Sequence, residues 1–147
     1  MSIEKVKAYF EAKGMLNRVM EFDVSSATVD LAAEALGVDG SRIAKTLSFL
    51  VKEKPVLVVT AGDARIDNAK FKAFFHVKAK MLSHDQAAEM IGHAVGGVCP
   101  FAVNEGVKVY LDESLRRFET VFPACGSSNS AIELTIPELE KYSGFEK

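Results

Sequence analysis

The sequence has little of what a disulfide-bonded, membrane-spanning or metal-dependent protein needs. It contains only two cysteines, which do not make a disulfide framework. Neither these cysteines nor the three histidines fall at the spacing of a metal-binding motif. The sequence contains no run of about 20 apolar residues, which is the length needed to span a membrane. The N-terminal residues lack the apolar core of a secretory signal. We therefore expect a cytosolic protein that uses neither a metal nor a cofactor.

The charge is nearly balanced, at −2 overall, which excludes a uniformly basic nucleic-acid binder. Between residues 65 and 80, however, there are five basic residues and one acidic residue. The basic residues are Arg65, Lys70, Lys72, Lys78 and Lys80. Such a patch can attract a polyanion to one face of an acidic protein. On charge alone, a solvated helix face without a partner remains the better explanation.

The length of 147 residues is that of about one domain, which can bury a substantial core. Apolar residues make up 48% of the chain and charged residues 26%, as in ordinary globular proteins. Predicted helices and strands interleave irregularly, and some strands are too close in sequence for βαβ crossovers. We expect a single α+β domain, residues 1–147, with helices around a mixed, curved or barrel-like β-sheet.

Capping residues and hydrophobic spacing locate the predicted helices. These cover residues 2–13, 28–36, 67–75, 83–91 and 137 onward, with a helical turn at 114–118. Apolar and β-branched runs predict strands at 18–23, 43–51, 56–61, 78–82, 108–112, 120–123 and 131–135. The unbroken apolar run at 56–61 is typical of a buried central strand.

Three segments combine polar or flexible residues with apolar surroundings. The first, residues 41–49, places Lys45 in an apolar strand, where its ammonium must reach the sheet edge or neutralise a charge. In a cleft, this ammonium can hold a phosphate, a ribose hydroxyl or a carbonyl oxygen. A lysine at a sheet edge is the commoner, structural alternative.

The second segment is the loop at 96–100, which contains two glycines and a proline. Such a loop can direct several backbone N–H groups at one carbonyl or carboxylate, and Gly97 has no Cβ to obstruct a close substrate. From the loop alone, a tight structural connection is favoured. The third segment, residues 126–130, carries small hydroxyl and amide side chains, which can bind a ligand or form a hydrophilic turn.

A cysteine nucleophile needs an imidazole beside it. His93 lies six residues before Cys99, but no flanking pattern of a cysteine hydrolase accompanies the pair. We therefore interpret Cys99 and Cys125 as small residues that line a pocket or fill the core.

In order and spacing, these three segments resemble the YbaK/prolyl-tRNA synthetase-associated editing domain family. The resemblance covers nearly the whole chain. It rests on Arg42-Ile43-Ala44-Lys45-Thr46-Leu47, on Gly96-Gly97-Val98-Cys99-Pro100-Phe101, and on the Gly126 segment that leads into Ala131-Ile132-Glu133-Leu134. The length is similar to that of free-standing members of the family rather than to the domain inserted within a synthetase.

The resemblance implies a trans-editing deacylase, which hydrolyses the ester between a wrong amino acid and the terminal adenosine of tRNA. The expected substrate is tRNA-Pro carrying cysteine, alanine or another small residue. The family lysine that matches Lys45 holds the end of the substrate, so Lys45 is the expected catalytic residue. The expected substrate-binding residues are Gly96, Gly97, Val98, Cys99, Pro100, Gly126, Ser127 and Asn129. The expected tRNA-binding residues are Lys70, Lys72, Lys78 and Lys80.

Ester hydrolysis needs a positioned water and stabilisation of the developing oxyanion, so it requires neither a metal nor a protein nucleophile. In some relatives a substrate thiol is thought to attack its own ester, which leaves the nucleophile open. The resemblance implies aminoacyl-tRNA as partner, with prolyl-tRNA synthetase as a further candidate and no DNA or membrane. A non-catalytic module that binds tRNA or a synthetase, and a small-molecule-binding protein, remain alternatives.

The amino-acid preference also stays open, because one methylene in a pocket is worth only about 1–3 kcal/mol. Val29, Leu47 and Cys99 are candidate wall residues of the pocket.

Overall fold

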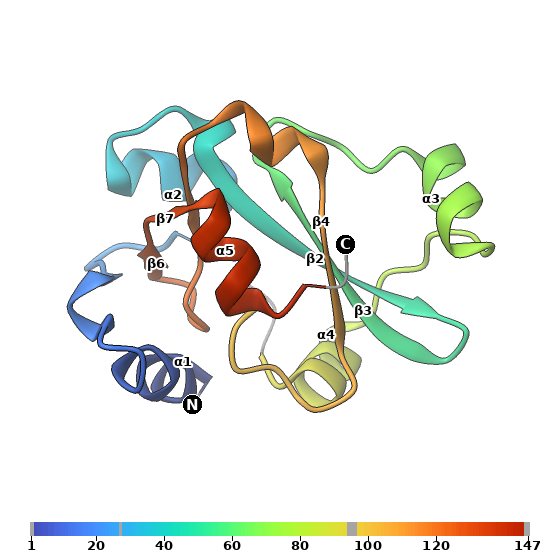
Figure 1. Ribbon diagram of the computed structural model, residues 1–147, viewed down its shortest axis with the longest axis horizontal. Helices are drawn as coiled ribbons and strands as arrows, with labels where there is room; N and C mark the ends of the chain where they lie inside the picture. The colour runs from blue at the N-terminus through green and yellow to red at the C-terminus, as the bar shows by residue number, and fades with distance from the viewer. Residues whose placement is uncertain (1, 27, 94–96, 146–147) are drawn as a thin grey trace.

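The computed structural model describes residues 2–26, 28–93 and 97–145, which form an α+β fold around a curled, mixed sheet (Figure 1). Within these residues the sheet has the strand order β4-β3-β2-β5-β7, and a smaller sheet pairs β1 with β6. The strands are β1 (Val19–Glu21), β2 (Ile43–Val51), β3 (Lys54–Ala61), β4 (Lys108–Leu111), β5 (Thr120–Pro123), β6 (Ser130–Ile132) and β7 (Leu134–Thr135). The predicted fold class is confirmed.

Polar side chains fix where several helices begin. The helices are α1 (Ser2–Glu11), α2 (Val29–Leu36), α3 (Asn68–Phe75), α4 (His84–Gln86) and α5 (Ile136–Ser143). Further helical turns are η1 (Leu16–Arg18), η2 (Gly40–Arg42), η3 (Ala87–Ile91) and η4 (Glu113–Arg117). Thr28, Asp67 and Ser83 accept hydrogen bonds from the first turns of α2, α3 and α4. Because each cap satisfies a backbone N–H that the helix cannot, these helices begin where the caps predict.

The antiparallel hairpin of β2 and β3 is the centre of the larger sheet. Side chains alternate between the faces of a strand, so Leu57 and Val59 enter the main core, which also contains Phe10 of α1. On the other face, Val58 packs in a second cluster with Phe71 of α3. β3 is therefore buried on both faces, as its apolar run predicts.

Two predicted strands differ in the structure. Residues 78–82 make only an isolated bridge, in which Met81 lies opposite Phe49. Residues 131–135 are divided between β6, which pairs with β1, and β7, which pairs with β5. Glu133 lies between the two strands, where the chain passes from one sheet to the other. Both differences arise because pairing depends on which strand edge is available.

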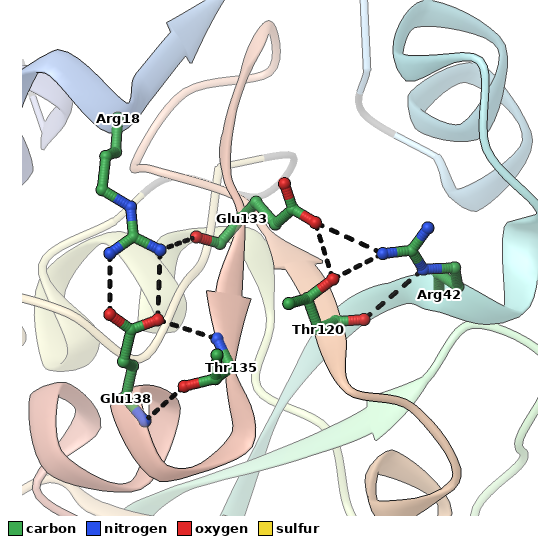
Figure 2. Close-up of polar contacts among 6 residues, drawn as sticks. All are labelled: Arg18, Arg42, Thr120, Glu133, Thr135 and Glu138. Carbon is green, nitrogen blue, oxygen red and sulfur yellow. Dashed lines mark hydrogen bonds and ion pairs between the residues drawn. The ribbon is translucent and has the colours of Figure 1, made fainter.

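Two networks of hydrogen bonds and ion pairs, each centred on an arginine, hold the chain where it crosses from β6 to β7 at Glu133 (Figure 2). Arg18 forms hydrogen bonds of 2.7 and 3.1 Å with the carboxylate of Glu138, and donates a third, of 2.7 Å, to the carbonyl of Glu133. The carboxylate of Glu138 also accepts from the backbone N–H of Thr135 at 2.9 Å, as part of the cap of α5. One carboxylate thus joins the start of α5 to η1.

Arg42 forms the second network, at the start of β2. Its guanidinium donates to Thr120 of β5 and lies 3.3 Å from the carboxylate of Glu133. The same group lies over the ring of Phe122, 5.0 Å from its centre. These contacts hold the first residues of β2 beside β5.

No helix among the described residues is long and apolar enough to cross a membrane.

Candidate functional site

A cavity of about 510 Å³ lies along one edge of β2 and is lined by its residues 43–48. Because consecutive strand side chains point to opposite faces, a cavity that contacts all six must wrap around the edge of the strand. Pairing of β2 with β5 ends at Ala44. The next contact on that side is a hydrogen bond of 3.1 Å from the N–H of Leu82 to the carbonyl of Ser48. The cavity therefore occupies the gap that these two contacts leave.

The remaining walls come from segments far apart in the sequence. They are formed by Ser26, Thr28, Val29, Ala32, Met81, Leu82, His84, Val98, Phe122, Ala124, Ser130 and Ala131. Most of these side chains are apolar, and among the described lining residues only Lys45 and His84 can carry a charge. Apolar walls with a few polar groups are typical of a site for part of an organic molecule. Nowhere among the described residues do three or more His, Cys, Asp or Glu side chains gather as a metal site would require.

Lys45 is half-buried on β2, opposite Thr60 of β3. The pKa of Asp63 is lowered mainly by its hydrogen bonds with Arg117. The positive charge of Lys45 lowers it further by a smaller amount, so Lys45 lies near Asp63. Asp63 is already paired with Arg117, with one hydrogen bond of 3.0 Å. None of the ion pairs among the described residues involves Lys45. Lys45 thus lines the cavity with a side chain that is not committed to an ion pair within these residues.

Thr46 presents backbone groups to the same cavity. In an antiparallel pair, residues alternate between bonding the partner strand and pointing away from it. Val59, opposite Thr46, directs its carbonyl to the other side, where it accepts from the N–H of Asp112 at 2.8 Å. The N–H and C=O of Thr46 therefore point to the free edge of β2. Its hydroxyl is buried and has no hydrogen-bond partner among the described residues.

His84 is exposed and lines the cavity from the first residue of α4. The position of α4 is fixed by the bond between Leu82 and Ser48, and by Ser83, which caps the helix. Sequence reasoning missed both His84 and Thr46 as site residues. It considered the histidines only as metal ligands or as partners of a cysteine, and no local pattern around His84 marks a shared cavity.

The predicted 96–100 loop contributes to the cavity through Val98. Gly96 lies outside the described residues, while Cys99 and Pro100 are buried and do not line the cavity. A Cβ on Gly97 would lie 2.7 Å from the backbone of Gly126 and of Ser127. The close approach that this glycine permits is therefore between two loops of the protein.

Cys99 and His93 lie side by side, with 3.6 Å between Sγ and Nε2. Both are buried, and neither lines the cavity. Burial raises the pKa of the Cys99 thiol to about 12 and lowers the pKa of His93, whose Nε2 donates to the carbonyl of Phe101 at 2.8 Å. Burial likewise raises the pKa of Cys125. A neutral thiol beside a neutral imidazole is not an activated nucleophile. Both cysteines belong to the main hydrophobic core.

Side chains of the third segment hold their own turn together. Ser127 Oγ lies within hydrogen-bond distance of Asn129 Oδ1, at 2.9 Å, and of Ser130 Oγ, at 2.8 Å. The amide of Asn129 donates to the carbonyl of Phe22 at 3.0 Å. Gly126, Ser127 and Asn129 do not line the cavity, whereas the next residue, Ser130, does. The turn therefore positions a wall of the site.

The predicted tRNA-binding lysines are all exposed. Lys70 and Lys72 lie on α3, and Lys70 lines a separate cavity of about 600 Å³ beside Phe74. Lys78 and Lys80 follow α3, and the carbonyl of Lys80 accepts from the N–H of Leu50 at 2.8 Å. Because the next residue is the cavity-lining Met81, the basic segment leads from α3 to the wall of the cavity.

Comparisons with known proteins identify the family of this chain. A family model described as the aminoacyl-tRNA editing domain matches residues 24–142. YwhH of Bacillus subtilis (strain 168), which is described as uncharacterized, is 54% identical over 144 residues, or 97% of this chain and 92% of YwhH. EbsC of Enterococcus faecalis (strain ATCC 700802 / V583), a candidate Cys-tRNA(Pro)/Cys-tRNA(Cys) deacylase by name, is 29% identical over 73% of this chain and 66% of EbsC.

The proline–tRNA ligase of Streptococcus sanguinis (strain SK36) is 30% identical over 60% of this chain, which corresponds to only 15% of the ligase. A crystal structure titled as that of a candidate trans-editing enzyme for prolyl-tRNA synthetase has a TM-score of 0.89 and 28% identity. That match covers 99% of this chain and 93% of the other. Together with the three motifs, these findings show that the chain belongs to the aminoacyl-tRNA editing domain family, in its YbaK/prolyl-tRNA synthetase-associated branch.

Proposed function

We propose that this protein is a trans-editing aminoacyl-tRNA deacylase, formed by residues 1–147 as one editing domain. Its reaction is hydrolysis of the ester between a wrong amino acid and the terminal adenosine of tRNA. The observation that carries the proposal is Lys45, which lines the mostly apolar cavity at the edge of β2 and belongs to no ion pair among the described residues. Family membership supports the editing chemistry in general terms.

In the proposed reaction, a water molecule attacks the carbonyl carbon of the aminoacyl ester. The ammonium of Lys45 stabilises the oxyanion that develops, and the N–H of Thr46 supplies a second donor at the same edge. Preorganised donors of this kind lower the barrier because they need no rearrangement as charge appears. The ribose oxygen then leaves as an alcohol. Because water is the nucleophile, the reaction forms no covalent intermediate with the protein.

The proposed substrate is tRNA-Pro that carries cysteine, alanine or another small amino acid. The names of EbsC and of the prolyl-tRNA synthetase relatives support this choice. Val29, Leu47 and Val98 give the cavity apolar walls, which suit a small side chain. Such walls discriminate by roughly 1–3 kcal/mol per methylene, so activity on more than one small residue is expected.

We further propose that Lys70, Lys72, Lys78 and Lys80 contact phosphates of the acceptor stem. Their segment ends beside Met81 in the wall of the cavity, so a stem that lies along it brings its 3′ end to Lys45. Prolyl-tRNA synthetase is a further candidate partner, because the enzyme that releases the mischarged tRNA can present it directly. The deacylation would then take place in the cytoplasm, where it removes mischarged tRNA before translation uses it.

A panel of charged tRNAs tests the proposal. Release of labelled amino acid would be measured from tRNA-Pro carrying cysteine, alanine, serine or proline, and from Cys-tRNA-Cys. We expect at least one small wrong residue to be released well above the rate of spontaneous hydrolysis, with Pro-tRNA-Pro spared. Saturable binding of tRNA without release would instead identify a non-catalytic module. Indifference to every tRNA would favour a small-molecule-binding protein.

A further inference from the structure

Hydrolysis of an ester moves two protons, and the cavity offers few groups that can carry them. The attacking water must lose a proton, and the departing ribose oxygen must gain one. None of the described lining residues is a carboxylate, and Lys45 is already assigned to the oxyanion. His84 is the remaining ionisable lining residue, and an imidazole can accept and then donate a proton near neutral pH.

We infer that His84 is a catalytic residue, the general base and then the general acid of the deacylation; this inference rests on the proposed function. Its imidazole has no hydrogen-bond or ion-pair partner among the described residues, and it is exposed to water at the cavity. Of the charged groups around it, Asp85 follows it in α4, and Lys45 lines the same cavity. No other histidine is so placed, because His93 is bonded to Phe101 and His76 is the C-cap of α3.

The fold holds His84 in this position by short-range contacts. Ser83 Oγ accepts from the N–H of Gln86 at 3.2 Å, and the side chain of Gln86 accepts from the N–H of Ser83 at 2.9 Å. This reciprocal cap fixes the start of α4. The bond from Leu82 to Ser48 then fixes that start against β2, two residues from Thr46 and three from Lys45. Base and oxyanion donor are thereby attached to the same strand edge.

The proton transfers balance in two steps. As the water oxygen bonds to the ester carbon, its proton passes to the neutral imidazole, and the carbonyl π electrons become the oxyanion beside Lys45. When the oxyanion collapses, the bond between carbon and ribose oxygen breaks, and the imidazolium gives its proton to that oxygen. The amino-acid product loses its carboxyl proton to solvent, and His84 returns to its neutral form.

The test uses His84→Ala in single-turnover and steady-state assays with a charged tRNA that carries no thiol, so that self-attack by the substrate cannot contribute. General acid–base catalysis contributes about 10²–10⁴-fold, so we expect kcat to fall at least about 100-fold. KM should change little, because His84 is assigned to proton transfer and not to binding. Because the site is open to solvent, added imidazole should restore a measurable part of the lost rate.

His76→Asn is the matched control, because His76 is an exposed histidine outside the cavity and Asn tolerates its positive φ of 66°. Its activity should equal that of the native protein and should not respond to imidazole. Thermal unfolding would confirm that each variant is folded, and His84→Gln provides a second variant that preserves polarity. An unchanged kcat, a rise in KM alone, or absence of imidazole rescue in a folded variant would overturn the role of His84.

The same assay separates the two levels of the argument. If the native protein releases no amino acid from any tRNA of the panel, the proposed function fails and the assignment of His84 fails with it. If the native protein is active and His84→Ala retains its rate, only the assignment of His84 fails.

Discussion

The guanidinium of Arg42 lies 5.0 Å from the centre of the Phe122 ring, and Phe122 lines the same cavity as Lys45. Arg42 also bonds Thr120 and pairs with Glu133 (Figure 2). It therefore holds the start of β2 against β5, just before the short pairing that ends at Ala44. The arginine of the first motif supports the wall of the cavity and does not line it.

Arg42→Lys should weaken this support while keeping the charge. Lysine cannot reproduce a planar guanidinium that stacks on a ring and donates to two neighbours. We expect the free energy of unfolding to fall by about 1 kcal/mol, as for an exposed cation–π contact. Urea unfolding would measure the change. Arg65→Lys is the control, because Arg65 is exposed and outside this network; equal losses in both variants would contradict the prediction.

Lys45→Ala should abolish deacylation without unfolding the protein. Removal of one oxyanion donor typically costs about 10²–10³ in kcat. Because Lys45 belongs to no ion pair or hydrophobic cluster among the described residues, stability should change by less than about 1 kcal/mol. Release of amino acid and thermal unfolding check the two parts. Lys54→Ala, at the exposed start of β3, should leave both unchanged; a fully active Lys45→Ala would remove lysine from the mechanism.

Gly97→Ala should destabilise the fold. The added methyl group would lie 2.7 Å from the backbone of Gly126 and Ser127, and backbone cannot move aside as a flexible side chain can. Overpacking of this kind typically costs about 1–3 kcal/mol. Gly40→Ala is a milder control, since its nearest contact is 3.4 Å, to a side chain of Val29. If Gly97→Ala kept its stability and lost only activity, the close approach would be to substrate instead.

Glu138 should make stability depend on pH in acid. The hydrogen bond from Arg18 is the main cause that lowers the pKa of Glu138 from 4.5 to about 2. A carboxyl whose pKa is lower in the folded state stabilises the protein above its unfolded pKa. That contribution is then lost as the pH falls from about 4.5 to about 2.

Glu138→Gln should therefore lower the free energy of unfolding by about 1 kcal/mol at pH 7, and by progressively less below pH 4.5. Denaturant titrations at several pH values would follow the difference between the two proteins. Glu105→Gln, at an exposed position, should give no such trend. A difference that stays constant down to about pH 2 would show that the ion pair with Arg18 contributes nothing.

Lys70→Glu with Lys72→Glu should flatten the salt dependence of tRNA binding. Each phosphate contact adds roughly −0.7 to −0.9 to the slope of log affinity against log salt. Affinity should fall for all tRNAs alike. The preference for one amino acid over another should remain, because phosphate contacts position the tRNA but do not recognise the attached amino acid. Lys13→Glu with Lys141→Glu changes the charge equally, near α1 and on α5, away from α3 (Figure 1). An unchanged slope in the first pair would place the tRNA elsewhere.

Local features could be predicted from the sequence because their causes are local. Thr28, Asp67 and Ser83 cap helices through bonds to residues three positions ahead, so each start is encoded within one turn. The strand predicted at 43–51 has the bounds of β2, since its apolar and β-branched residues require burial on a sheet. The three motifs also identified the family, although their roles as a site stay predictions.

Other features depend on contacts between residues far apart in the chain, so they became visible only in the folded protein. Residues 78–82 have the composition of a strand but bridge β2 only at Met81, opposite Phe49. Gly97 faces the backbone of another loop, which no local pattern reports. Helix caps and apolar runs predict where most helices and strands form, and the three motifs predict the family. Lys45 and His84 line the same cavity because β2 and β5 stop pairing at Ala44. The segment that carries His84 lies along the edge of β2 beyond that point.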